Sequence, residues 1–176
     1  MRNFNLTSAV ICLVLCFFSY TFVSPQTEMK KNKAPDFSIR DIQGKRIQLT
    51  ELLKQGPVLI DFWALWCIPC RKKLPHLQTF YNRYKEKGLI VLTINEDDPS
   101  NESKVKPFIK GNRYKFLVVV DKDKELFRNF KVISLPTLFL IDQQGNIQQT
   151  HVGYRPGDEK QLEKDIQELL LIKDTK

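Results

Sequence analysis

The amino-acid sequence predicts an α/β domain whose central sheet is covered by helices on both faces. Three observations lead to this prediction. Apolar segments of strand length alternate with amphipathic segments of helical period along most of the chain, as is typical of α/β proteins. A hairpin pattern closes the series of strands before a final helix. With 176 residues, the chain is long enough for one domain with its own core.

The first half of the domain is expected to contain a hairpin, a buried strand and a long helix. Apolar and polar residues alternate on both sides of Gly44, which predicts a short hairpin over residues 37–49. The apolar run 58–63 predicts the first core strand. Residues 71–87 carry apolar side chains at helical spacing, so we expect one amphipathic helix there.

The second half continues the alternation of strands and helices. The acidic, polar stretch 96–102 is expected to form a loop, and residues 144–146 the turn of a terminal hairpin. The expected strands are 89–95, 116–120, 137–142 and 147–153, and the expected helices are 103–110, 125–130 and 158–172.

The first 27 residues have the composition of a secretory signal or an N-terminal membrane anchor. Arg2 precedes a charge-free segment whose most apolar part spans residues 9–18. The segment approaches the roughly 20 residues that a membrane span needs, so cleavage and retention both stay open. Lipidation of Cys16 is disfavoured because the large residue Leu15 precedes it, and lipid attachment sites have a small residue there.

This interpretation divides the chain into three parts. Residues 1–27 are the signal peptide or anchor, residues 28–33 a polar linker, and residues 34–176 the folded domain. We therefore expect an exported protein, periplasmic or held on the outer face of the cytoplasmic membrane through its N-terminal segment.

The chain is basic, with a formal net charge of +8. A basic surface suits nucleic acid or anionic membranes. Here, however, the lysines and arginines are spread along the chain and interleaved with acids. This pattern favours an ordinary solvated surface, and we expect no nucleic-acid partner.

Cys67 and Cys70 are the two cysteines that remain once the leader is set aside. One closely spaced pair in an exported protein excludes a framework of several disulfides and leaves a redox pair or half of a metal site. The pair stands where a strand gives way to a helix, and Pro69 is tolerated in a first helical turn. Unpaired N–H groups and the helix dipole there should stabilise a thiolate on Cys67.

In the redox interpretation, Cys67 forms a mixed disulfide with a partner protein and Cys70 resolves it. Other interpretations fit less well. Haem attachment needs histidine where Arg71 stands, and a zinc site needs two more ligands, for which the sequence offers His76 and His151. A copper metallochaperone on a similar fold would carry three residues between the cysteines and a distal histidine, and a related peroxidase would lack the Trp-Cys-x-x-Cys arrangement. We expect no metal and no cofactor.

Two segments carry a family resemblance. FWALWCIPC and SLPT, at residues 134–137, resemble the active-site and cis-proline segments of thioredoxin-like proteins. APDFSIRDIQGKRIQLTELL, with the extra helix and strand between Asn95 and Asp121, is similar to exported TlpA- and ResA-type thiol-disulfide oxidoreductases of the redoxin, or AhpC/TSA-like, group. The similarity covers roughly residues 34–170. It implies a thioredoxin-like fold with a central mixed sheet, an N-terminal β-hairpin and an inserted helix and strand.

Asp61 is the third candidate catalytic residue. It lies in an otherwise apolar strand, six residues before Cys67, so desolvation should raise its pKa. The resemblance implies that Asp61 accepts the proton of Cys70, and the alternative is a hydrogen-bonded buried acid with a structural role. In some relatives a lysine from the neighbouring strand assists this acid, and the corresponding region here offers Thr93.

The remaining candidates are expected to bind substrate. The resemblance implies a cis peptide bond at Pro136, which would leave the backbone of Leu135 free to pair with an extended client segment and would keep metal ions away from the thiols. An ordinary proline at a strand entry is the alternative. Trp66 is expected to form an apolar rim, while Ile68 and Pro69 tune the reduction potential beside it.

Together these features predict an extracytoplasmic thiol-disulfide oxidoreductase that reduces client proteins and carries a Cys67–Cys70 disulfide when oxidised. A reductant in an oxidising compartment needs a supply of electrons, so we expect a membrane thiol-transfer protein as donor. By resemblance, apocytochrome c is a candidate client, which would place the protein in cytochrome c maturation. A disulfide-forming oxidant is the main alternative.

Overall fold

The computed structural model describes residues 32–174, with side chains up to Leu171. The predicted leader, 1–27, and most of the predicted linker, 28–33, lie outside this range. Among the residues described, no helix combines the length and the apolar character needed to cross a bilayer.

Five strands form the central mixed sheet, in the order β5-β4-β3-β6-β7. Neighbours β3, β4 and β5 run parallel, whereas β6 is antiparallel to both β3 and β7. The strands are β3 (Val58–Trp63), β4 (Ile90–Asn95), β5 (Leu117–Val120), β6 (Thr137–Ile141) and β7 (Ile147–Val152). A separate antiparallel hairpin precedes them, made of β1 (Ser38–Arg40) and β2 (Arg46–Gln48). The predicted mixed sheet and N-terminal hairpin are confirmed.

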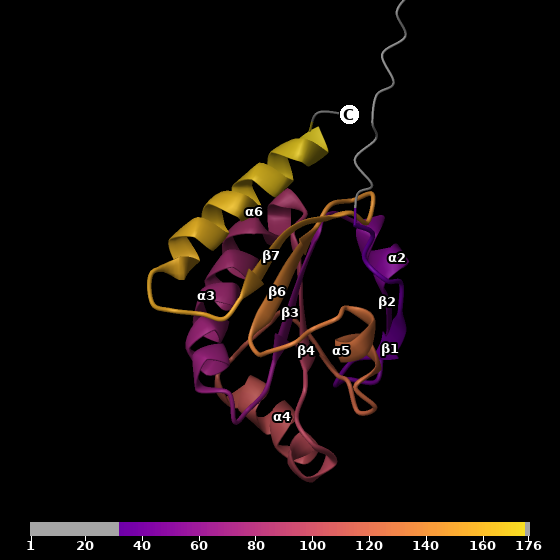
Figure 1. Cartoon of the computed structure of the whole chain (residues 1–176), viewed down its shortest axis with the longest axis vertical. Helices are drawn as coiled ribbons and strands as arrows, with labels where there is room; N and C mark the ends of the chain where they lie inside the picture. Colours follow the sequence, from indigo (N-terminus) through magenta and orange to yellow (C-terminus); the bar gives the residue numbers. More distant parts are fainter. Residues whose placement is uncertain (1–31, 175–176) are drawn as a thin grey trace, which may run out of the picture. The chain divides into compact units, whose positions relative to one another are not determined.

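Helices cover both faces of the sheet (Figure 1). The long helices α3 (Ile68–Tyr84) and α6 (Asp158–Asp174) lie together over one face. The short helices α2 (Leu49–Leu53) and α5 (Glu125–Asn129) lie with the hairpin over the other. The inserted helix α4 (Pro99–Gly111) connects β4 to β5.

The side-chain alternation of β3 divides the core into two parts. Leu59 and Trp63 pack in one cluster with buried side chains of α3, α4 and α6, and Ile60 and Phe62 pack in the other with the hairpin, α2 and α5. Because side chains alternate along a strand, Asp61 belongs with Leu59 and Trp63 on the face covered by α3. The strand itself therefore directs a carboxyl group toward the helix that carries the cysteines.

The predicted bounds of two helices, α3 and α4, are wrong. The stretch 96–102 was expected to be a loop, but α4 begins at Pro99, because a proline at the first helical position loses no hydrogen bond. The helix expected at 71–87 begins earlier, at Ile68, and its last residues form a separate 3₁₀ turn, Lys85–Lys87, that ends at Gly88. The earlier start places Cys70 inside α3 and Cys67 at its N-cap.

Candidate redox site

Cys67 and Cys70 lie at the N-terminus of α3 and are joined by a disulfide, with their Cα atoms 5.2 Å apart. Cys67 is the N-cap residue, and its Sγ accepts a hydrogen bond of 3.2 Å from the backbone N–H of Cys70. Cys67 is 4% exposed and Cys70 is fully buried. The sulfur nearer the surface is thus also the one at the positive end of the helix, where a thiolate is favoured.

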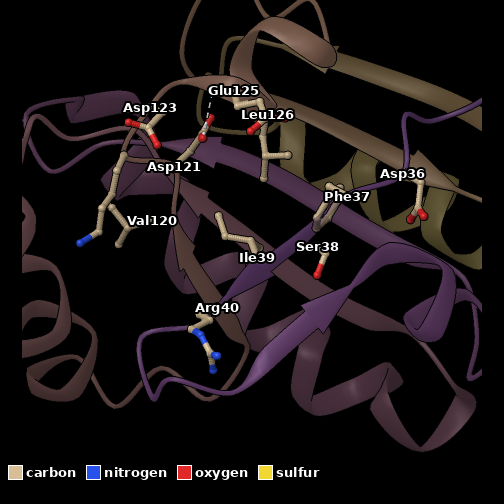
Figure 2. A pocket seen from close by; sticks show the side chains of 11 residues that line it. Asp36, Phe37, Ser38, Ile39, Arg40, Val120, Asp121, Asp123, Glu125 and Leu126 are labelled. Carbon is tan, nitrogen blue, oxygen red and sulfur yellow. Dashed lines mark hydrogen bonds between the residues drawn. The ribbon is translucent and has the colours of Figure 1, made fainter.

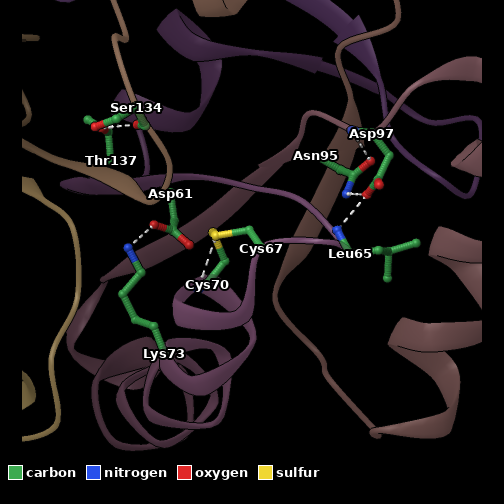
Figure 3. Close-up of a disulfide and its surroundings, with 9 residues drawn as sticks. All are labelled: Asp61, Leu65, Cys67, Cys70, Lys73, Asn95, Asp97, Ser134 and Thr137. Atoms are coloured by element: carbon green, nitrogen blue, oxygen red, sulfur yellow. Dashed lines mark hydrogen bonds and ion pairs between the residues drawn. A yellow bond between two sulfur atoms is a disulfide. The ribbon is translucent and has the colours of Figure 1, made fainter.

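A network of polar groups holds the loop between β3 and α3 in place. The backbone N–H of Leu65 donates to Oδ2 of Asp97 at 2.7 Å, and the side-chain amide of Asn95 donates to the same oxygen at 2.8 Å (Figure 3). The N–H of Asp97 in turn donates to Asn95 Oδ1 at 3.1 Å. Sequence reasoning missed both residues. Their one signal was a polar residue at the end of a buried strand and another just after it, which is where the functional loops of a parallel sheet gather.

Asp61 is fully buried, and its carboxylate points toward the disulfide in Figure 3. In the sheet it pairs with Thr93 of β4 and Leu138 of β6. Its charged partner is Lys73 of α3, which forms an ion pair with Oδ1. Burial raises the pKa of Asp61 above its ordinary value, and the charge and hydrogen bond of Lys73 act in the opposite direction. Lys73 was not among the residues singled out from the sequence.

The peptide bond between Leu135 and Pro136 is cis. The hydroxyl of Thr137 donates to the carbonyl of Ser134 at 2.7 Å, and the N–H of Gly153 donates to the carbonyl of Pro136 at 2.7 Å. Pro136 is buried and Leu135 is half-buried. In the sheet Phe62 pairs with Thr137, so the loop carrying Pro136 lies next to the loop that follows β3 and leads to the cysteines.

Exposed apolar side chains occur on both of these loops. Trp66 is 62% exposed and Ile68 is 58% exposed, on either side of Cys67, and Pro69 is exposed as well. Ile133, which precedes Pro136, is 87% exposed. Exposed apolar groups around a reactive atom are typical of a surface that receives a partner. Ile133 was not singled out from the sequence because it lies between a predicted helix and a predicted strand. Trp63, by contrast, is fully buried and packs against Phe108.

Glu96 is a buried acidic residue beside the start of the loop that follows β3. The N–H of Glu96 donates to the carbonyl of Trp63 at 2.7 Å, and its side chain lies near Lys124, whose Nζ is 3.4 Å from Oε2. Burial, followed by the charge of Asp121, raises the pKa of Glu96 to about 8. The charge and hydrogen bond of Lys124 lower the pKa, but by less than burial and Asp121 raise it. The Nζ of Lys124 also donates to the carbonyls of Glu96 and Asp97.

A pocket with several acidic residues lies elsewhere, and Asp121 in its lining has a structural role. A pocket of about 290 Å³ between β1 and α5 is lined by Asp36, Arg40, Asp121, Asp123 and Glu125 among others (Figure 2). Both oxygens of Asp121 accept backbone N–H groups of α5, from Glu125 and Phe127. Across residues 32–174, no group of three or more His, Cys, Asp or Glu side chains is arranged to hold a metal ion.

Comparisons with known proteins agree with this geometry. The profile of the AhpC/TSA family matches residues 31–150. Thiol-disulfide oxidoreductase ResA of Bacillus cereus is 35% identical over 174 residues, which is 96% of this chain and 98% of the relative.

Solved structures show the same likeness. StoA from Bacillus subtilis is 31% identical, with a TM-score of 0.63, over 74% of this chain and 96% of that one. A thiol:disulfide interchange protein of the thioredoxin family from Chlorobium tepidum TLS is 25% identical, with a TM-score of 0.70, over 80% of this chain and 97% of that one. The predicted thioredoxin-like fold and the predicted ResA-type resemblance are confirmed.

Proposed function

Because this chain belongs to the AhpC/TSA family and is a thiol-disulfide oxidoreductase of the ResA type, we propose that it works outside the cytoplasm, where Cys67 and Cys70 reduce disulfide bonds in client proteins. The observation that carries the proposal is the cysteine pair at the N-terminus of α3, with its outer sulfur beside exposed apolar side chains. Such a site offers a nucleophile and a surface to receive a folded or unfolded client.

The cycle balances in two thiol–disulfide exchanges. The Cys67 thiolate attacks one sulfur of a client disulfide, which forms a mixed disulfide and releases the other client sulfur as a thiolate. The Cys70 thiolate then attacks the Cys67 sulfur, which closes the Cys67–Cys70 disulfide and releases the second client thiolate. Two electrons pass to the client, whose thiolates take up two protons, and Asp61 takes the proton that Cys70 loses.

Client binding is assigned to the loops on both sides of the sulfurs. Trp66, Ile68 and Pro69 form the apolar rim on one loop, and Leu135 and Pro136 offer backbone to an extended client segment on the other. A client held there would present its disulfide to Cys67.

The compartment and the partners complete the proposal. The charge-free segment after Arg2 supports export or anchoring at the membrane. In an oxidising compartment the pair would remain a disulfide unless a membrane thiol-transfer protein re-reduced it. Apocytochrome c, whose haem-binding cysteines must be reduced before haem attaches, is the client class that we propose.

The test is to trap the mixed disulfide. With Cys70→Ser the first exchange can occur and the second cannot, so clients should accumulate on Cys67 in a form that dithiothreitol releases. Cys67→Ser/Cys70→Ser is the matched control and should trap nothing. If Cys70→Ser recovers no client from cells, or if the purified protein holds copper on the two sulfurs, the proposal is overturned.

A further inference from the structure

Lys73 is the most deeply buried charged cation in the described part of the chain, with 3% of its side chain exposed. Lysine is almost never fully buried unless it is paired. Its ion pair with Asp61 joins two groups that make no hydrogen bond to any other side chain or backbone group within residues 32–174. The two charges therefore depend on each other.

The position of Lys73 follows from the period of α3. Cys70, Lys73 and Leu77 are spaced by three and four residues, so they share the buried face of the helix. This face lies over the face of the sheet to which Asp61 belongs. The helix that carries the resolving cysteine thus also brings a cation to the acid beneath it, one turn further along.

The neighbouring strand does not provide that cation. Thr93 lies beside Asp61 in the sheet, and its hydroxyl is 3.4 Å from the carbonyl of Leu117, on the other side of β4. The cation paired with Asp61 therefore comes from α3, the helix that also carries Cys70.

A pocket leads from the surface to Lys73. Its volume is about 310 Å³, and it lies between β7 and α6, lined by Lys73, Leu138, His151, Tyr154 and Asp158 among others. The titratable groups that line it are Lys73 from α3, His151 from β7, and Tyr154 and Asp158 from the β7–α6 region. Asp165 of α6 lies behind His151, with its Oδ2 2.8 Å from His151 Nε2. Asp61 does not line this pocket, whereas Lys73 does, although its Nζ is buried.

We propose that Lys73 is a positioning residue that keeps Asp61 ionised to accept the proton of Cys70, and that the pocket behind Lys73 connects the pair to solvent. The inference rests on the proposed redox function. In the resting site Asp61 is a carboxylate paired with the Lys73 ammonium. When Cys70 becomes a thiolate, its proton passes to Asp61. Asp61 then gives up this proton, which leaves to water through the pocket behind Lys73, so solvent gains the one proton that Cys70 lost.

The first experiment compares Lys73→Met with Lys72→Met, which removes a neighbouring, exposed ammonium of the same helix. Reduced protein is mixed with a peptide disulfide in a single turnover, and release of the second peptide thiol is followed between about pH 5 and pH 9. Without Lys73 the Asp61 carboxyl stays protonated to higher pH, so the rate rise should move up by about one unit and the rate near pH 7 should fall about tenfold. The rates should converge near the ordinary thiol pKa of about 8.5, where no base is needed.

One further comparison keeps the inference testable if Lys73→Met folds poorly, and a second measurement tests it where Lys73→Met folds. The first compares Asp61→Asn with Asp61→Asn/Lys73→Met, in which no carboxylate is left unpaired. If Lys73 acts through Asp61, the added substitution should leave the rate of the second step unchanged. The second follows the Asp61 carboxyl carbon by NMR in the oxidised protein, where its titration should move to higher pH in Lys73→Met and stay in place in Lys72→Met.

The outcomes separate the two claims. If the wild type reduces the peptide but Lys73→Met and Lys72→Met share one pH profile, or if Lys73→Met slows the Asp61→Asn protein further, the role of Lys73 is overturned and the redox function stands. If the wild type reduces no disulfide while Lys73→Met still moves the Asp61 titration, the redox function is overturned and the pairing stands.

Discussion

The side chain of Asp97 holds the backbone that leads to the cysteines, since it accepts the N–H of Leu65. Asp97→Ala should leave this N–H and the Asn95 amide without their partner, which costs roughly 1–3 kcal/mol of unfolding free energy. Urea denaturation measures the loss. Asp98→Ala is the control, because Asp98 is exposed and its side chain caps nothing. Equal stability of the two variants would contradict the role given to Asp97.

Glu96 should make stability depend on pH. The folded protein holds this proton up to a pKa of about 8, whereas an unfolded glutamate releases it near 4.5. The stabilisation from the neutral carboxyl is therefore complete below about 4.5 and is lost as pH rises toward about 8. Glu96→Gln should remove this dependence, which is worth roughly 2–4 kcal/mol, while exposed Glu86→Gln should not. Urea denaturation of the oxidised protein at several pH values across this range measures the dependence. If the unfolding free energies of Glu96→Gln and wild type change with pH in parallel, the role given to Glu96 is refuted.

Single residues were predictable from the sequence where one local signal was enough. The spacing of the cysteines and the acid inside an apolar strand identified Cys67, Cys70 and Asp61 as candidates. Lys73 was missed because it follows Arg71 and Lys72, and a run of three cations reads as a solvated surface. Its spacing from Cys70 and Leu77 was the signal that could have placed it on the buried face.

Among the elements, the loop before β6 gives the clearest test of client binding. Ile133→Asp places a charge on its most exposed apolar side chain, so kcat/KM for a protein client should fall about tenfold, or ~1.4 kcal/mol. The rate with a small aromatic disulfide should stay unchanged, because the thiols are intact. Leu171→Asp is the control, since Leu171 is exposed beside Arg83 and Tyr84 at the far end of α3. Equal loss with both substrates would contradict a docking role.

The turns before β3 and β4 approach each other so closely that position 56 has room only for a glycine. A Cβ added at Gly56 would lie 2.0 Å from the carbonyl oxygen of Gly88, so backbone would have to move. Gly56→Ala should lower the unfolding free energy by roughly 1–3 kcal/mol. Gly111→Ala, at the end of α4, meets nothing within 4 Å and should be neutral. Calorimetric melting of both variants measures the difference, and equal melting temperatures would show that the approach is not tight.

At the level of elements, the strands and the starts of α5 and α6 were predictable, and the starts of α3 and α4 were not. A buried strand such as β3 is a short, mostly apolar run that begins directly after a glycine and a proline, so its start could be read from the sequence. The starts of α3 and α4 depend on a proline in the first helical turn, and the same residue also marks loops. The choice between the two is made by the tertiary packing that follows.

For the whole molecule, the sequence predicted the layers but not the convergence of groups from different elements. The alternation of strands and helices gave the α/β architecture, and the resemblance gave the mixed sheet. Asp61 contacts Lys73, and Leu65 contacts Asp97. Which residues meet in these contacts depends on the order of the strands and on the rotation of α3 about its axis. A local sequence pattern predicts neither of these.

The proposed function depends on Cys67 and Cys70 working as a reducing dithiol. The most direct measurement equilibrates the purified protein with dithiothreitol buffers and counts free thiols after alkylation. We expect one two-electron transition, at about −270 mV or lower, that disappears in Cys67→Ser/Cys70→Ser. A transition near about −120 mV would identify an oxidant instead, and the absence of any transition would contradict the redox role itself.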